Sequence, residues 1–326
     1  MSDIPMTPDY AGAAPIKALV HVPSQVPDTI YSELIRIGRV VAPPPTEALY
    51  APLSECEPYT GVRVQRDVSY GSDARNLLDV FTPENDQTNR PVLVFLHGGA
   101  FIRGDRRIGN SPFNDNIALW AARQGFLGIN MTYRLAPAHG WPAAQHDIHF
   151  ALAWLRANAE LFGADANRIV LMGHSAGAAH VAQYVAFPEF HVVSGGGIAG
   201  AVMLSGIFDP STANVNRPLQ AYFGSDESLY SARSAVPGLT ATDVPLLVAF
   251  AELDPPDFHA QSQQLHAALC KAGRQENLYQ MMGHSHMSEI FSINTHDDAL
   301  STLLKEFFAN AIQFDFDLGR NNISEN

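Results

Sequence analysis

The chain has 326 residues, of which 46% are hydrophobic and only 16% are charged, and its formal net charge at pH 7 is −13. This apolar content is enough to bury a large core, which excludes an intrinsically disordered chain and a small disulfide-stapled module. A sequence pI near 5.3 describes an acidic surface, which phosphate backbones and anionic membranes repel. Neither nucleic acid nor a membrane is therefore an expected partner.

The cysteines and the N-terminus bear on the compartment. Cys56 and Cys270 lie in neither a C-x-x-C pair nor a Cys/His ligand spacing, so no disulfide or metal framework is expected. Residues 1–17 lack a basic head followed by an apolar run, and the chain contains no long uncharged apolar segment. We therefore expect a cytoplasmic protein, and the sequence allows a homodimer.

Residues 1–60 are rich in proline, with a run of three at positions 43–45. Because proline lacks the N–H that a sheet needs, we expect this segment to wrap over the surface as part of a cap rather than join a sheet. One helix is expected within it, from Thr29 to about Val41 with Asp28 as its N-cap, because apolar residues recur there at helical spacing.

From Gly61 onward short apolar segments alternate with longer amphipathic ones, a pattern typical of a mostly parallel sheet with helices on both faces. We expect about eight strands, at Val62–Tyr70, Leu77–Phe81, Val92–Leu96, Leu127–Thr132, Ile169–Met172, Ala201–Ser205, Leu246–Ala251 and Asn277–Met281. Helices are expected at Asn114–Gln124, Ala143–Leu161, Ala176–Ala186, Phe258–Ala272 and Asp297–Ala311. Because no helix separates the first two strands, they should pair as an antiparallel hairpin at one edge.

This alternation predicts a single α/β domain over residues 61–314. Short and weakly periodic segments interrupt it at 209–242, which predicts a cap-like insertion above the sheet. Residues 315–326 form a polar tail, which we expect to fray rather than pack.

The sharpest motif follows the apolar run Ile169–Met172 and reads Gly173-His174-Ser175-Ala176-Gly177. Strand, tight turn and helix are the context that a G-x-S-x-G nucleophile elbow requires. Its glycines leave room for a strained turn that exposes the serine hydroxyl, and the helix N-terminus favours developing negative charge. An ordinary glycine-rich turn is the alternative.

A second glycine motif, His97-Gly98-Gly99-Ala100-Phe101, follows the expected strand Val92–Leu96. Consecutive glycines let backbone N–H groups turn toward one point, where they can stabilise the oxyanion of acyl transfer. The alternative is a plain glycine turn with His97 packed in the core. Together the two motifs make Ser175 the candidate nucleophile.

A serine nucleophile needs a base that takes its proton and a carboxylate that orients the base. Asp254 comes directly after the expected strand Leu246–Ala251, where an open α/β sheet places its site. We prefer it to Asp209, which ends the preceding strand, and to Asp257, which can cap the next helix. A turn-forming aspartate before proline is the alternative reading of Asp254.

Two histidines are candidates for the base, because His284 and His286 both follow the last expected strand. Alternate residues point in different directions, so only one of them should reach Ser175. A metal site at the same histidines is the alternative, but no third ligand stands at a suitable spacing. We therefore expect neither a metal nor a cofactor.

One further pattern is rejected. Gly195, Gly197 and Gly200 match G-x-G-x-x-G, which binds dinucleotides only when it follows a strand and opens a helix. Here the glycines lead into a strand, so no dinucleotide site is predicted.

The order of oxyanion loop, serine, aspartate and histidine resembles the α/β-hydrolase family, and within it the hormone-sensitive-lipase-like esterases. The resemblance runs from about Val62 to Ala311. It also rests on two segments that are similar to that family's YRLAP sequence and F/W-P-A helix start, Tyr133-Arg134-Leu135-Ala136-Pro137 and Trp141-Pro142-Ala143.

This resemblance implies an α/β-hydrolase fold with a small cap, in which Ser175 is the nucleophile and Asp254 the acid. The oxyanion donors that it implies are the backbone N–H groups of Gly98, Gly99 and Ala176. Relatives carry an apolar or aromatic residue after the catalytic histidine, so His286, which precedes Met287, is preferred to His284.

Two positions depart from the family pattern. Ala100 stands where a third glycine is usual, and His174 stands where an aspartate often precedes the nucleophile. Both variants resemble those of bacterial feruloyl or acetyl-xylan esterases and of arylformamidases, which leaves the substrate subgroup open. For the substrate pocket we expect four residues near these loops and the insertion: Phe101, Tyr222, Phe223 and Met287.

The function implied is hydrolysis of small carboxylic esters, with short acyl or aryl groups, through an acyl-enzyme. An arylformamidase or amidase with the same triad is the alternative. A non-catalytic receptor built on this fold is a third possibility, because fold alone does not determine function.

Overall fold

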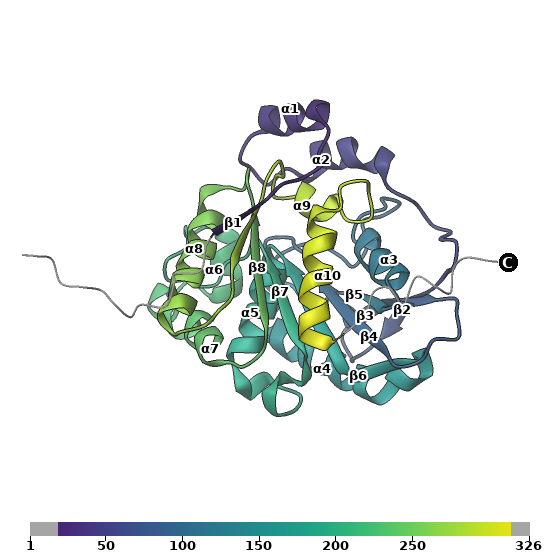
Figure 1. The fold of residues 1–326 in the computed structure, drawn as a ribbon. Coiled ribbons are helices and arrows are strands. Elements are labelled where there is room, and N and C mark those ends of the chain that lie inside the picture. The colour runs from purple at the N-terminus through teal and green to yellow at the C-terminus, as the bar shows by residue number, and fades with distance from the viewer. Residues whose placement is uncertain (1–18, 314–326) are drawn as a thin grey trace, which may run out of the picture.

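Nine strands form one sheet within residues 19–313, the part of the chain that the computed structural model describes (Figure 1). Their order is β1-β9-β8-β7-β6-β4-β5-β3-β2; the pairs β2–β3 and β3–β5 are antiparallel and the others are parallel. The strands are β1 (Leu19–Val22), β2 (Val62–Ser69), β3 (Leu77–Pro83), β4 (Arg90–Leu96), β5 (Leu127–Met131), β6 (Ala164–His174), β7 (Gly200–Leu204), β8 (Leu246–Ala251) and β9 (Leu278–Met281).

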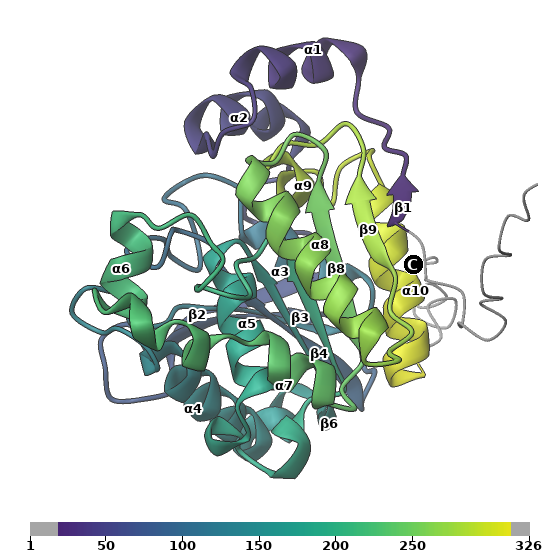
Figure 2. The same ribbon diagram turned by 90° about the vertical axis from the view of Figure 1, so that its left-hand side faces the viewer.

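Helices cover both faces of this sheet. The α-helices within the described residues are α1 (Asp28–Ile37), α2 (Pro43–Tyr50), α3 (Asp115–Arg123), α4 (Ala143–Asn158), α5 (Ala176–Ala186), α6 (Arg217–Phe223), α7 (Val236–Ala241), α8 (Pro256–Lys271), α9 (Ser288–Phe291) and α10 (Ala299–Ile312). Figure 2 shows α1 and α2 above the carboxyl ends of β8 and β9. No helix among residues 19–313 combines the length and apolarity needed to cross a membrane.

Alternating side chains of the central strands fill two apolar cores, one on each face. Along β4, Val92 and Val94 point to the face covered by α4, α5, α7 and α8. Leu93 and Phe95 point to the opposite face, under α3, α9 and α10 (Figure 1). Because both faces are covered there, the central strands β5, β7 and β8 are buried along their whole length, as parallel strands usually are. The predicted fold class, a mostly parallel sheet with helices on both faces, is confirmed.

The expected strands and the edge hairpin are present, but the N-terminal segment differs from the prediction. Leu19–Val22 forms a ninth strand that pairs in parallel with β9 at the edge opposite β2. These four residues contain no proline, and Pro23 follows them. The prolines at 43–45 begin α2 rather than prevent it, because the first turn of a helix leaves its N–H groups unpaired in any case.

The prediction for the first helix was also wrong at both ends. The first helix ends at Ile37 rather than near Val41, because the next residue, Gly38, takes a non-helical φ of 88°. Asp28 lies inside the first turn of this helix instead of capping it. Within 209–242, α7 packs against α5 and so belongs to the helical layer: a Cβ on Gly238 would lie 2.0 Å from the carbonyl oxygen of Ala186. The predicted polar tail at 315–326 lies outside the described residues.

A buried cluster of charges joins the edge hairpin to α3 and to the loop after β4. Asp79 of β3 is fully buried, and its two carboxylate oxygens accept hydrogen bonds from Arg66 and from Arg106, each at 2.8 Å. Arg66 Nη1 also donates to Asp115 Oδ1 at 2.9 Å. Burial raises the pKa of Asp79 above its usual range although Arg66 opposes the shift, so the carboxylate depends on these partners.

Replacing Asp79 by asparagine should lower the free energy of unfolding by about 3 kcal/mol, because two largely buried arginines lose their shared counter-charge. Urea denaturation followed by circular dichroism measures this loss. The matched control is Glu33→Gln, which breaks an exposed ion pair with Arg36 on α1 and should leave the midpoint unchanged. Equal midpoints for the two variants would contradict the role given to Asp79.

Candidate active site

Ser175 lies in a strained turn between β6 and α5. Its φ and ψ are 57° and −121°, a positive φ that few non-glycine residues adopt. The turn is tight because Gly177 packs directly on β4, where a Cβ would lie 2.1 Å from the carbonyl oxygen of Leu96. The Ser175 N–H donates to the carbonyl of Leu204 at 2.9 Å, which ties the turn to β7. The motif therefore folds as the elbow that the sequence predicts.

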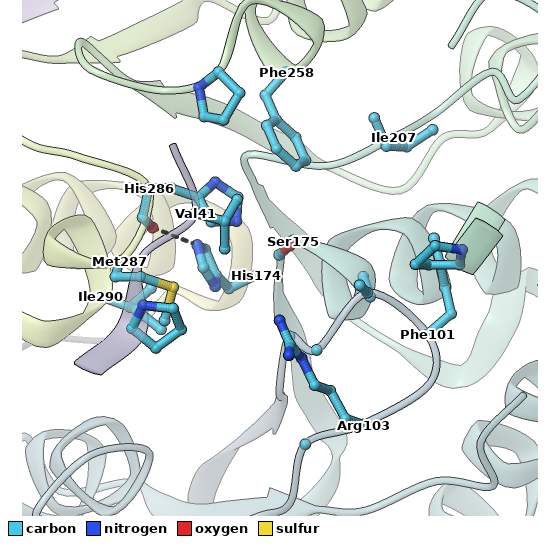
Figure 3. Close-up of a pocket in the computed structure, with 18 of the residues that line it drawn as sticks. Val41, Phe101, Arg103, His174, Ser175, Ile207, Phe258, His286, Met287 and Ile290 are labelled. Carbon is cyan, nitrogen blue, oxygen red and sulfur yellow. Dashed lines mark hydrogen bonds between the residues drawn. The ribbon is translucent and has the colours of Figure 1, made fainter. Parts of the chain in front are cut away.

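Asp254 and His286 meet at the carboxyl ends of β8 and β9. The His286 Nδ1–H donates to Asp254 Oδ1 at 2.6 Å, and both side chains are fully buried. A neutral imidazole that donates from Nδ1 carries its lone pair on Nε2. Within residues 19–313 that Nε2 has no hydrogen-bond partner, and His286 lines the same cavity as Ser175 (Figure 3). The arrangement can take a proton from a group in this cavity.

The competing residues have other partners. His284 Nε2 lies 3.0 Å from Asp297 Oδ2, and its Nδ1 lies 3.2 Å from the hydroxyl of Ser288. Asp209 accepts from Ser211 at 2.7 Å, and Asp257 accepts from the N–H of Asn214. The geometry thus pairs His286 with Asp254 and with neither Asp209 nor Asp257. No group of His, Cys, Asp or Glu that could hold a metal ion occurs in the described part of the chain.

The glycine loop after β4 lies against the serine turn. A Cβ on Gly98 would lie 3.1 Å from Ser175 Cβ, and one on Gly99, whose φ is 136°, would lie 2.0 Å from the carbonyl oxygen of Arg103. Only glycine fits this second position. Ala100 has a φ of 51°, a positive value that glycine adopts more readily than alanine. Gly98, Gly99 and Ala176 all line the cavity beside Ser175.

Tyr133 and Arg75 stabilise this loop through hydrogen bonds to backbone carbonyl groups. The Tyr133 hydroxyl donates to the carbonyl oxygen of His97 at 2.6 Å, and the two rings stack with centroids 4.5 Å apart. Arg75 donates from Nε to the Tyr133 carbonyl at 2.7 Å and from Nη2 to the Gly104 carbonyl at 2.9 Å. The YRLAP motif contains Tyr133 but shows nothing of this contact, and Arg75 lies in no motif.

His174 fixes the backbone of the neighbouring histidine. Its Nε2 donates to the His286 carbonyl oxygen at 2.7 Å, the contact drawn as a dashed line in Figure 3. Burial lowers the pKa of His174 to about 4 although the charge of Asp254 opposes the shift, so the ring is neutral near pH 7. The residue that replaces the family's aspartate therefore positions His286 without adding a charge.

A family model described as BD-FAE matches residues 78–269, which include Ser175 and Asp254. The chain belongs to the BD-FAE family. His286 lies beyond the matched segment, so its assignment rests on the geometry described above.

Curated relatives of this BD-FAE chain include esterases of Mycobacterium tuberculosis. Esterase LipC is 40% identical over 114 residues, which are 35% of this chain and 27% of LipC. Esterase LipQ is 27% identical over 241 residues, which are 68% of this chain and 56% of LipQ. The chain thus spans about a quarter of LipC and just over half of LipQ.

Solved structures show the same fold. Esterase B from Lactobacillus rhamnosis aligns with a TM-score of 0.69 at 18% identity over 87% of this chain and 95% of that chain. A bacterial heroin esterase aligns with a TM-score of 0.63 at 24% identity over 88% of this chain and 96% of that chain. The expected α/β-hydrolase fold is confirmed.

The cavity of the BD-FAE chain has a volume of about 790 Å³. Phe101 and Met287 line it as predicted, whereas Tyr222 and Phe223 are absent from its described lining. They are buried behind Phe101, with ring centroids 4.8 and 5.6 Å from its ring, because α6 turns both aromatic side chains into the core. Lining residues that the motifs do not mark come from α2, α6, α8, α9 and the loops: Val41, Pro43, Pro44, Ile108, Ile207, Leu219, Phe258 and Ile290.

Tyr133→Phe should lower kcat several-fold with little change in KM, because it frees the loop carrying Gly98 and Gly99 without altering the cavity wall. The lost hydrogen bond should also reduce the free energy of unfolding by about 1 kcal/mol. Steady-state kinetics and urea denaturation measure the two effects. Tyr184→Phe is the matched control, since its hydroxyl donates to Gly196 on another loop; kinetics that match in the two variants would refute the loop-support role.

Proposed function

We propose that this BD-FAE chain is a serine carboxylesterase that hydrolyses small esters through an acyl-enzyme. The observation that carries the proposal is the His286–Asp254 pair: within the described residues the His286 Nε2 has no hydrogen-bond partner, and His286 lines one cavity with Ser175, Gly98 and Gly99. The names of LipC, LipQ and esterase B support an ester rather than an amide substrate. Rates on matched ester and anilide substrates would distinguish it from the arylformamidase or amidase alternative.

Each proposed step uses one of these groups. His286 Nε2 accepts the Ser175 hydroxyl proton as the serine oxygen bonds to the carbonyl carbon, and Asp254 stabilises the imidazolium. The N–H groups of Gly98, Gly99 and Ala176 stabilise the oxyanion. The alcohol leaves with the proton from His286, and water then repeats the attack on the acyl-enzyme to release the acid.

We further propose that the N-terminal segment and the 209–242 insertion form the cap. Pro43, Pro44 and Glu47 of α2 line one side of the cavity, and Asn214, Asn216 and Leu219 of the insertion line another. These residues come from parts of the chain far apart in sequence, and they enclose the mouth above Ser175. The cap would limit the size of the group that reaches the serine.

Ser175→Ala should lower kcat by about 10⁴-fold or more while the protein stays folded, because the nucleophile contributes to chemistry and little to packing. Covalent labelling by a serine-directed phosphonate, followed by intact mass, should be lost as well. Wild-type activity of this variant on a short ester would overturn the proposal.

His286→Ala should abolish turnover, whereas His284→Ala should lower kcat far less, because His284 faces Asp297 rather than the cavity. The same p-nitrophenyl ester assay compares the two variants, with circular dichroism as the check on folding. The opposite ranking would transfer the base to His284 and contradict the pairing seen in the structure.

Short acyl groups, of about two to six carbons, should be the best substrates. A cavity of about 790 Å³ suits a small molecule, and the polar residues Glu47, Asn214 and Asp257 in its lining oppose adsorption to a lipid interface. The rate should rise with pH along the acid limb of the profile, because the base must be neutral to accept a proton. An acyl-length series of p-nitrophenyl esters tests the first expectation, and the same assay as a function of pH tests the second. A preference for about twelve carbons or more would contradict the first, and a rate that falls as the pH rises along the acid limb would contradict the second.

The homodimer and the cytoplasmic location stay predictions. Sedimentation of the purified chain tests the first, and fractionation of the source cells tests the second.

A further inference from the structure

A serine hydroxyl bridges the proposed catalytic carboxylate to a second buried acid. Ser205 follows β7, and its Oγ lies 2.6 Å from Asp254 Oδ2 and 2.5 Å from Oε1 of Glu289 in α9. All three side chains are fully buried. No residue of the proposed mechanism other than Asp254 belongs to this bridge.

The bridge needs one more proton than three ordinary side chains supply. A serine hydroxyl carries a single hydrogen, and an ionised carboxylate can only accept. Ser205 therefore donates to one of the two acids, and the other must itself be protonated if it is to be hydrogen-bonded to Oγ. An unpaired second carboxylate buried at this distance would instead repel the first.

The surroundings show which acid holds that proton. Asp254 has two more donors, the His286 ring on Oδ1 and the N–H of Ala251 on Oδ2 at 2.8 Å, so its negative charge is stabilised. Glu289 has no such support: its Oε2 lacks a partner within the described residues. His174, 3.3 Å from Glu289 Oε1, is neutral and already donates its Nε2 proton to the His286 carbonyl.

We propose that Glu289 is a neutral carboxylic acid whose O–H donates a hydrogen bond to Ser205, which in turn donates one to Asp254. These two hydrogen bonds position the carboxylate that orients His286. The proposal rests on the esterase function proposed above. It makes Glu289 and Ser205 positioning residues that act through Asp254, and no proton moves along these hydrogen bonds during turnover.

The electrostatic surroundings agree with a neutral Glu289. Burial, and then the charge of Asp254, raise the pKa of Glu289 well above its usual range, although His286 and His284 oppose the shift. The titratable groups that face it or its turn come from five elements: His174 at the end of β6, Asp254 after β8, His284 and His286 before α9, Asp297 before α10, and Tyr50 of α2.

The protonation state can be measured without activity. Infrared spectra of the purified protein near pH 7 should contain the C=O stretch of a protonated carboxylic acid that is absent from Glu289→Gln. Difference spectra in which this variant instead loses a carboxylate band would overturn the proposal. Because this readout needs no turnover, it stands even if the proposed ester substrate is wrong.

Kinetics test the positioning role. Glutamine is neutral and can donate from its amide to Ser205, so Glu289→Gln should keep most of kcat and the acid limb of the pH profile should not move. Glu289→Ala and Ser205→Ala should each lower kcat about tenfold or more with little change in KM. If Glu289 were ionised, the glutamine variant would lose a negative charge near His286. That loss would disfavour the imidazolium and move the acid limb to lower pH, and such a move would refute the proposal.

Ser262→Ala is the matched control for Ser205→Ala. Ser262 is another fully buried serine, in α8, whose hydroxyl has no partner in the described chain, so its loss should leave kcat and the pH profile unchanged. Phosphonate labelling of Ser175 in every variant separates the two hypotheses. Unlabelled wild-type protein would indicate failure of the esterase proposal, whereas normal labelling with wild-type kinetics in Ser205→Ala would indicate failure of the bridge alone.

Discussion

The buried negative charge of Asp254 is the constraint around which this site is arranged. A carboxylate shielded from water must find donors for both oxygens, because desolvating it unpaired would cost a large part of a domain's net stability. The donors are the N–H of Ala251, the ring of His286 and the hydroxyl of Ser205. They come from the ends of three strands that the sheet places side by side, β7, β8 and β9. Strand order is therefore a condition for the proposed chemistry as well as for the core.

The other half of the site depends on close backbone contact rather than on charge. Gly177 packs on the end of β4, and Gly98 packs on Ser175, so the Ser175 turn and the glycine loop form one packed unit. The Tyr133 hydroxyl stabilises this unit through a hydrogen bond to the His97 carbonyl oxygen. N–H groups held in this way need little reorganisation when charge develops on a substrate, which is the condition for oxyanion stabilisation.

The sequence predicted most of the sheet and the residues that meet at its carboxyl edge, because both depend on local patterns. Apolar runs mark strands buried on two faces, and the glycines mark turns that no side chain could enter. Ser205 and Glu289 were missed because a buried serine and a helical glutamate look ordinary until the fold brings them to Asp254. Tyr222 and Phe223 were misplaced because the direction in which α6 turns its aromatic rings depends on tertiary packing. β1 was missed since a four-residue edge strand has too little periodicity to recognise.

The N-terminal segment has a consequence for how substrate enters. β1 and β2 follow one another in the chain but are the two opposite edges of the sheet, so the residues between them, including α1 and α2, run across the strand ends from one edge to the other (Figure 1). Such a strap is held at both ends by strand hydrogen bonds. It cannot swing aside about a single hinge without separating β1 from β9. Because Pro43 and Pro44 of α2 line the cavity, any widening of the cavity on this side must come from bending within the strap.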